Sequence, residues 1–203
     1  GLPQARLADI VAVQLALPAR AGMAQRLVAL LRQCPSLHKL GQVVARDRRL
    51  APELRARLQT LESLPATTPM HEILPAIRRE LGARIDEVEI GAAPLAEASV
   101  AVVVPFTGHA CGAPRVEGVF KLLRPGIEAR LREELDLRPA LGDFLARRGA
   151  ELGLPPLDYR DALDGVAELL LHEMRPEQEQ AHLAAAARRY AGMPGLHVPA
   201  LLP

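Results

Sequence analysis

The chain of 203 residues is long enough for one domain with a helical extension, and 49% apolar residues with a formal net charge of +1 are typical of a folded globular protein. A nearly balanced charge provides no strong field for a polyanion, and 2% aromatic residues leave few side chains to stack on bases, so we expect no nucleic-acid partner. No run of 18 uncharged apolar residues occurs that could span a membrane. The two cysteines, Cys34 and Cys111, do not suggest a disulfide framework, and we expect a cytoplasmic protein with reduced thiols.

Two helices are predicted within residues 1–35. Apolar residues recur at helical spacing in 5–17, and again in a second run that ends before Pro35. Their stripes consist of Leu7, Ile10, Val11 and Leu15, and of Met23, Leu27, Leu30 and Leu31. Such a pair could lie on a membrane surface, because Arg6, Arg20, Arg26 and Arg32 suit anionic headgroups. Packing into the core is the more usual fate of such stripes, and we expect it here.

Three further helices are predicted before residue 83. The first spans 36–46, directs Leu37, Leu40, Val43 and Val44 inward and contains Lys39-Leu40-Gly41-Gln42. Because glycine inside a helix costs about 0.5–1 kcal/mol relative to alanine, Gly41 suggests a close approach of backbone or ligand. The second begins at Pro52 and runs to Leu61. The third is capped by Thr68, begins at Pro69 and stops at Gly82, and Pro75 predicts a kink or a restart inside it.

A small antiparallel sheet is predicted from 85–90, 99–106 and 116–122, with a hairpin loop at 107–115. The β-branched run 100–104 is the strongest signal for it. Helices then return, first in 127–145 with a break at Pro139. Another is capped by Asp158 and has an inner face of Leu163, Val166, Leu170 and Met174, and Pro176 restarts the helix toward Tyr190. The predicted fold class is therefore α+β, mostly helical, with a small antiparallel sheet.

Lys121 lies inside the predicted strand 116–122. An unpaired buried ammonium costs several kcal/mol, so this lysine must reach water or find a carboxylate. It is either an ordinary edge-strand lysine or the phosphate-binding lysine of a kinase-like N-lobe, which sits on a strand and pairs with a helix glutamate.

The ordered motifs resemble those of the UbiB family of atypical protein-kinase-like proteins, associated with ubiquinone and other prenyl-lipid metabolism. Lys39-Leu40-Gly41-Gln42 is similar to its KxGQ helix, and residues 120–127, FKLLRPGI, are similar to its strand lysine followed by RPGI. The resemblance covers about 36–203. It implies a helical extension at 1–35, a KxGQ-type helical region at 36–82 and a kinase-like N-lobe with inserted helices at 83–203, the C-lobe being absent.

The resemblance also implies a nucleotide site. Lys121 would face the phosphates and pair with Glu179, while Lys39 and Gln42 of the KxGQ helix would occupy the pocket. An alanine-rich loop with Ala96, Ala98 and Ser99 would replace the glycine-rich loop of ordinary kinases. Glu173 would be the first acidic residue of the family's ExD motif. ATP is the implied cofactor.

Several residues depart from the family pattern. Glu97 brings a negative charge into the alanine-rich loop, whose serine is no longer followed by Gly-Gln, and Arg175 replaces the second acidic residue of ExD. The chain holds no catalytic-loop aspartate with its asparagine and no Asp-Phe-Gly, the groups that orient the nucleophile and hold Mg²⁺. We therefore expect no catalytic residue, no Mg²⁺ site in this chain alone and no ATP hydrolysis by it.

Other chemistry finds less support. His109, Cys111, His172 and His182 lack the spacing of a metal site, and Asp161 and Asp164 with Glu168 fit the solvated face of a helix. Because the chain starts at Gly1 without methionine and ends at Leu-Leu-Pro, we expect a piece of something longer.

Two functions follow from these observations. The first is the regulatory or catalytically incomplete N-terminal region and N-lobe of a UbiB-like kinase or ATPase linked to quinone or prenyl-lipid metabolism. Its partners would be a nucleotide or prenyl lipid, a missing C-lobe or partner protein, and a membrane surface that it meets peripherally. The alternative is a non-enzymatic helical module that binds a lipid or a partner protein.

Overall fold

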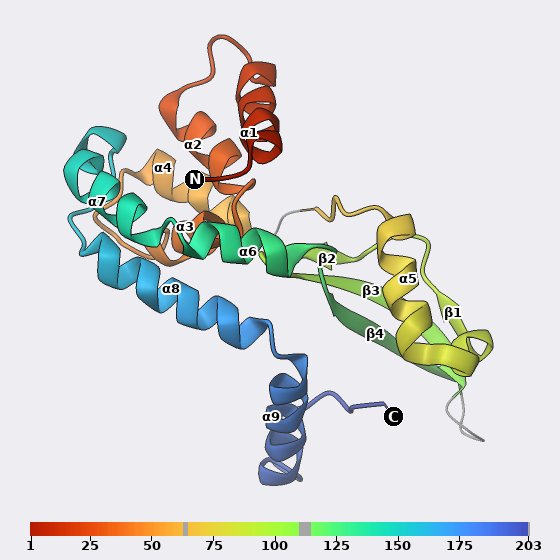
Figure 1. The fold of residues 1–203 in the computed structure, drawn as a ribbon. Helices are drawn as coiled ribbons and strands as arrows, with labels where there is room; N and C mark the ends of the chain where they lie inside the picture. Colours follow the sequence, from red (N-terminus) through yellow and green to blue (C-terminus); the bar gives the residue numbers. More distant parts are fainter. Residues whose placement is uncertain (63–64, 110–114, 203) are drawn as a thin grey trace.

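A computed structural model describes residues 1–62, 65–109 and 115–202 and divides them into a helical block, a sheet region and a projecting helix (Figure 1). The helical block consists of α1 (Gln4–Ala16), α2 (Met23–Leu31), α3 (Pro35–Val44), α4 (Pro52–Gln59), η1 (Thr60–Glu62), α6 (Ile127–Leu135), α7 (Arg138–Arg148), η3 (Ala150–Leu152) and α8 (Tyr159–Glu173). The sheet region consists of α5 (Met70–Leu81), η2 (Gly82–Glu87), β1 (Val88–Ile90), β2 (Ala96–Glu97), β3 (Ala101–His109) and β4 (Arg115–Leu123). The projecting helix is α9 (Pro176–Arg189).

The sheet is antiparallel, and β3 is its central strand. β4 pairs with one edge of β3, while β1 and β2 pair with the two ends of its other edge. The register places Lys121 opposite Val103 and Phe120 opposite Val104. Side chains alternate along a strand, so Lys121 and Phe120 lie on opposite faces. The predicted α+β class with a small antiparallel sheet is confirmed.

Two hydrophobic cores hold the molecule together. The larger one joins the helices of the block, and its best-covered members include Leu58, Leu163 and Leu170. The smaller one lies between α5 and the sheet and consists of Ile73, Ile77, Val102 and Val104. α5 therefore covers only the Phe120 face of the sheet. Within the described residues, no helix combines the length and apolar character needed to cross a bilayer.

The predicted elements after the sheet are confirmed. The carboxylate of Asp158 accepts hydrogen bonds from the amides of Arg160 and Asp161, which is the predicted N-cap of α8. Leu163, Val166 and Leu170 are buried on its inner face. α8 ends before Pro176, where α9 begins, because proline has no amide hydrogen to continue the helix.

The structure corrects the predictions for 68–90 at three points. Thr68 does not cap α5, because its hydroxyl and amide donate to Glu97, and α5 runs through Pro75 without a restart, held by the burial of Ile73 and Ile77. The predicted strand 85–90 is confirmed only from Val88, since residues 82–87 form a 3₁₀ helix. Its apolar residues Ile85 and Val88 are three apart, which is one 3₁₀ turn rather than the two-residue period of a strand.

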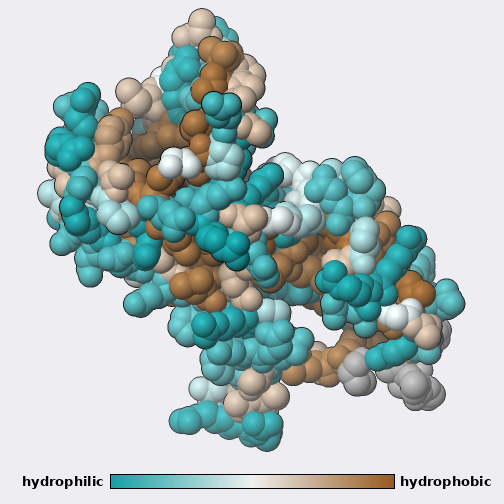
Figure 2. Space-filling view, viewed as in Figure 1, coloured by the Kyte–Doolittle hydropathy of each residue, from teal (hydrophilic) through white to brown (hydrophobic). Residues whose placement is uncertain are grey.

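The stripe of α1 is not buried as predicted, whereas in α2 Leu31 is buried and Leu27 packs on the core, so that the prediction is wrong there only for Met23. Leu7, Val11 and Leu15 of α1 and Met23 of α2 are 46–79% exposed, and α1 has no buried residue. Figure 2 shows apolar side chains gathered on the surface over α1 and α2. α1 packs mainly on α2, so a single neighbour covers only one side of the helix. Val43, also predicted inward, is 42% exposed, because α3 buries the face of Leu40 and Val44 instead.

Candidate functional site

Lys121 projects from β4 on the sheet face that α5 leaves open. Along β4 exposed and less exposed residues alternate, and Lys121 and Val119 lie on the exposed side. The Nζ of Lys121 lies 2.6 Å from both carboxylate oxygens of Glu179, in the first turn of α9. The side chains are 48% and 52% exposed, so the ion pair is accessible to solvent. Pro176 starts the new helix whose first turn places Glu179 at Lys121.

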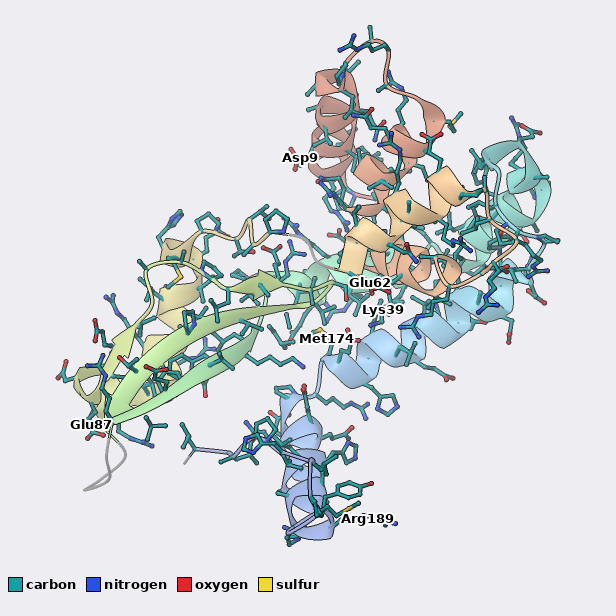
Figure 3. The ribbon with its side chains drawn as sticks, turned by 180° about the vertical axis from the view of Figure 1, so that it is seen from behind. Asp9, Lys39, Glu62, Glu87, Met174 and Arg189 are labelled. Carbon is teal, nitrogen blue, oxygen red and sulfur yellow. The ribbon has the colours of Figure 1, made fainter. Side chains whose placement is uncertain are left out.

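Lys39 forms a second, more enclosed ion pair at the end of α8. Its Nζ lies 2.5 Å from Oε1 of Glu173, and the side chains are 21% and 34% exposed. The hydroxyl of Ser99, which is buried just before β3, lies 3.4 Å from the other carboxylate oxygen. Figure 3 shows Lys39 beside Met174, the residue that follows Glu173. The contacts connect α3, α8 and the loop before β3.

The chain contains only two lysines among its 25 basic residues, and both form these ion pairs. Their glutamate partners flank the junction between α8 and α9, six positions apart. The remaining residues among these 25 are all arginines. The guanidinium is a planar fork, whereas the ammonium is a compact point charge. Both junction sites therefore hold the compact cation.

Gly41 and Gln42 of the KLGQ segment lie against the helical block. A Cβ at Gly41 would stand 2.8 Å from Leu61 and 2.9 Å from Leu31, so glycine lets α3 pack closely on its helical neighbours. The close approach that Gly41 predicts is therefore to Leu61 and Leu31 of the helical block. The side-chain amide of Gln42 donates a hydrogen bond to the backbone carbonyl of Leu61, at 3.0 Å. Lys39 and Gln42 thus contact different partners.

The alanine-rich loop is partly a strand. Ala96 pairs with Val103 in β2, and the amide of Ala98 donates to the carbonyl of Ala101 in the turn to β3. Ser99 follows this turn and reaches Glu173. The backbone of this segment is therefore held by the sheet, with Ala96 and Ala98 on either side of Glu97.

Glu97 is bound on several sides rather than left as an open negative charge. It accepts hydrogen bonds from the amides of Thr67 and Thr68 at 2.7 and 2.8 Å, and it pairs with Arg124 at 2.9 Å. Burial opposes ionisation of this carboxyl, but the two amides and the Arg124 charge outweigh it and lower its pKa. Burial also lowers the pKa of Arg124, against the attraction of Glu97. The expected open charge beside the phosphates is thus compensated within the chain, and Glu97 does not compete for Lys121.

Sequence reasoning missed the polar cluster around Glu134. This buried carboxylate accepts from the amide and hydroxyl of Ser36 at 2.9 and 2.6 Å and pairs with Arg6 of α1. Arg6 also pairs with Glu133 at 2.9 Å. Burial and the Glu134 charge raise the pKa of neighbouring Cys34 to about 11, so its thiol stays protonated at neutral pH. Glu134 lies three positions after Leu131 and seven after Ile127, so helical spacing places it on the buried face of α6, and a glutamate on that face was the local signal available in the sequence.

In the ranges that the structure describes, no three histidine, cysteine, aspartate or glutamate side chains gather as metal ligands. Cys111 lies outside the described residues.

Two curated proteins, both named "Probable protein kinase UbiB", are similar to this chain. The one from Marinobacter nauticus is 29% identical over 170 residues, which cover 81% of this chain and 30% of that protein. The one from Azotobacter vinelandii is 30% identical over 170 residues, with the same coverage. The chain therefore spans about 30% of the length of these relatives. No protein-family model and no solved structure matches it.

A small antiparallel sheet whose strand lysine pairs with a helix glutamate is the arrangement of a protein-kinase-like N-lobe. Over most of its length the chain is also similar to these two UbiB proteins, in agreement with the resemblance of its motifs to the UbiB family.

Proposed function

We propose that this chain is the N-terminal region and N-lobe of a UbiB-like atypical kinase or ATPase linked to quinone or prenyl-lipid metabolism. It binds the phosphates of ATP or ADP at Lys121 and serves a regulatory rather than a catalytic role. The observation that carries this proposal is the Lys121–Glu179 ion pair on the open face of the sheet. In protein kinases such a pair places the lysine for the nucleotide phosphates.

The second lysine supports the regulatory part of the proposal. The Lys39–Glu173 pair ties the KxGQ-type helix to Ser99 and to the end of α8, six residues before the partner of Lys121. We propose that Lys39, Gln42, Ser99 and Glu173 hold this helix beside the nucleotide, with Ala96 and Ala98 in the covering loop. Phosphoryl transfer needs a metal-binding aspartate and a base, and the chain has no Asp-Phe-Gly to provide the first. Nucleotide binding without hydrolysis is the expected activity of these 203 residues.

Competitive amine labelling tests the proposal, because Lys39 and Lys121 are the only lysines. The protein is treated with limiting acetic anhydride, with and without millimolar ADP, and acetylation at each lysine is quantified by peptide mass spectrometry. We expect ADP to protect Lys121 several-fold, and magnesium to add little. At 100 times its dissociation constant, ADP should also stabilise the fold by about 2.7 kcal/mol in thermal unfolding.

Two glutamates in the same helical turn provide the variant and its control. Glu179→Gln should weaken the protection of Lys121 by ADP, because the carboxylate that positions the lysine is lost. Glu177→Gln should behave as the unmodified protein, since Glu177 is exposed and has no ion pair among the described residues. Unchanged labelling and melting at millimolar ADP would refute nucleotide binding.

One observation favours the alternative of a non-enzymatic module. The exposed stripe Leu7, Val11 and Leu15 on α1 is a surface on which a partner protein or a lipid could dock. Under that alternative the chain would bind liposomes or a partner peripherally in the cytoplasm, and ADP would change neither binding nor melting.

A further inference from the structure

A cavity of about 500 Å³ separates α1 and α2 from the loop between β2 and β3. Its volume lies within the range of small-molecule sites, roughly 300–1,000 Å³. One part of the wall is apolar, with Val13 and Leu17 from the α1 segment and Ala29 from α2. Another part carries three arginines, Arg32, Arg124 and Arg130. The cavity is thus amphipathic.

The arginines leave this cavity with excess positive charge. Arg124 is neutralised by Glu97, which also lines the cavity. Arg32 and Arg130 have no side-chain hydrogen bond or ion pair to any residue that the structure describes. The charge of Arg130 acts to lower the pKa of Arg124, and the charges of Arg124 and Arg32 add to the burial that lowers the pKa of His38. An anion would relieve this repulsion.

We propose that the cavity binds a small amphipathic organic anion. Its carboxylate or phosphate head lies between Arg32 and Arg130, and its apolar body packs on Val13, Leu17 and Ala29. Two guanidinium groups with free donors match the planar oxygens of such a head. A purely inorganic anion would leave the apolar wall unused, and a neutral apolar molecule would leave the guanidinium groups uncompensated. Lys121 does not line this cavity, whereas Ala98 of the proposed covering loop does.

Octanoate is the probe. 1-Octanol is the control for the apolar body without the charged head, and inorganic phosphate is the control for an anion without an apolar body. Isothermal titration calorimetry on the whole 203-residue chain should show saturable binding of one octanoate. Octanol and phosphate should bind at least tenfold more weakly. Absence of octanoate binding at millimolar concentration, or equal affinity for octanol or phosphate, would overturn the proposal.

Paired variants locate the site. Arg130→Gln and Arg32→Gln should each weaken octanoate binding at least tenfold. Arg132 lies on the same helix as Arg130 and is also exposed but does not line the cavity, so Arg132→Gln should stay within twofold. Ala29→Leu, which fills the apolar end without introducing charge, should abolish binding, and thermal melting confirms that this variant folds. Equal affinities for the Arg130 and Arg132 variants, or full binding by a folded Ala29→Leu protein, would refute the assignment.

Discussion

Among the described residues, the core of the helical block contains seventeen buried residues from α2 to α8, whereas the core between α5 and the sheet contains four. Helices surround the core of the helical block on several sides. The sheet is covered by α5 on one face, and its other face presents Lys121 and Val119 to solvent. α9, which supplies the partner of Lys121, has no buried residue and projects from the rest (Figure 1).

The larger core, which should stabilise the chain most, and the candidate site at Lys121 therefore lie in different regions of the molecule. Burial of apolar area supplies most of the free energy of folding, so the helical block should dominate the stability of the chain. The open face of the sheet contributes little to packing and is free to bind a ligand. Polar contacts of Ser99 with Glu173 and of Glu97 with Arg124 connect the two regions.

Removing a large side chain from the helical core should have the largest effect. Leu170 of α8 is fully buried, and Leu170→Ala should lower the free energy of unfolding by about 2–5 kcal/mol through lost burial and a residual cavity. The neighbouring Leu171 is 46% exposed, so Leu171→Ala should change it by under about 0.5 kcal/mol. Urea unfolding followed by circular dichroism measures both. Similar losses for the two variants would contradict the core assignment.

The boundary between the regions should depend on pH through Glu97. Glu97→Gln should cost about 1–3 kcal/mol at neutral pH, because Arg124 loses its counter-charge and the Thr67 and Thr68 amides lose a charged acceptor. The folded-state pKa of Glu97 is lowered, so this contribution is fully present above the unfolded pKa of about 4.3 and is lost as the pH falls through the folded value.

Urea midpoints between pH 7 and pH 3 test this dependence. The unmodified protein should lose more stability on acidification than Glu97→Gln. Glu89→Gln is the control, since Glu89 also pairs with an arginine but is 79% exposed. Parallel pH profiles for the Glu97 variant and the unmodified protein would show that this carboxylate does not contribute.

Replacing Lys39, whose ion pair is more enclosed, should lower the stability of the chain more than replacing Lys121. Lys39→Ala should cost about 1–2 kcal/mol, because it leaves the partly buried Glu173 without its charged donor. Lys121→Ala should cost under about 1 kcal/mol, because solvent screens a half-exposed pair. Thermal unfolding of both variants without nucleotide measures the difference, and a larger loss for Lys121 would reverse the comparison.

The smallest effect is expected on α1. Leu15 is 79% exposed, so Leu15→Ser should change the free energy of unfolding by under about 0.5 kcal/mol. Chemical denaturation measures it, with Ile10→Ser at a half-buried position of the same helix as the more sensitive comparison. A loss above 1 kcal/mol for Leu15→Ser would mean that α1 buries this stripe after all.

The local patterns of the sequence determined most elements and the Lys121–Glu179 pair. β-branched residues define β3, proline and Asp158 define the ends of α8 and α9, and the motif spacing selected Glu179 for Lys121. These signals are local or belong to a family motif, so they can be read without knowing the packing. The functional roles of Lys121, Lys39 and the other site residues remain predictions.

Only the tertiary structure decided which apolar stripes are buried and where the remaining charges go. Leu15 and Leu163 both lie in amphipathic stripes, yet one is 79% and the other 1% exposed, because burial depends on which helices pack alongside. Likewise Glu97 meets Thr67 and Arg124, and Glu134 meets Ser36 and Arg6, across 27 to 128 positions of sequence. Such contacts follow from how the chain folds back on itself, and no periodicity within one segment encodes them.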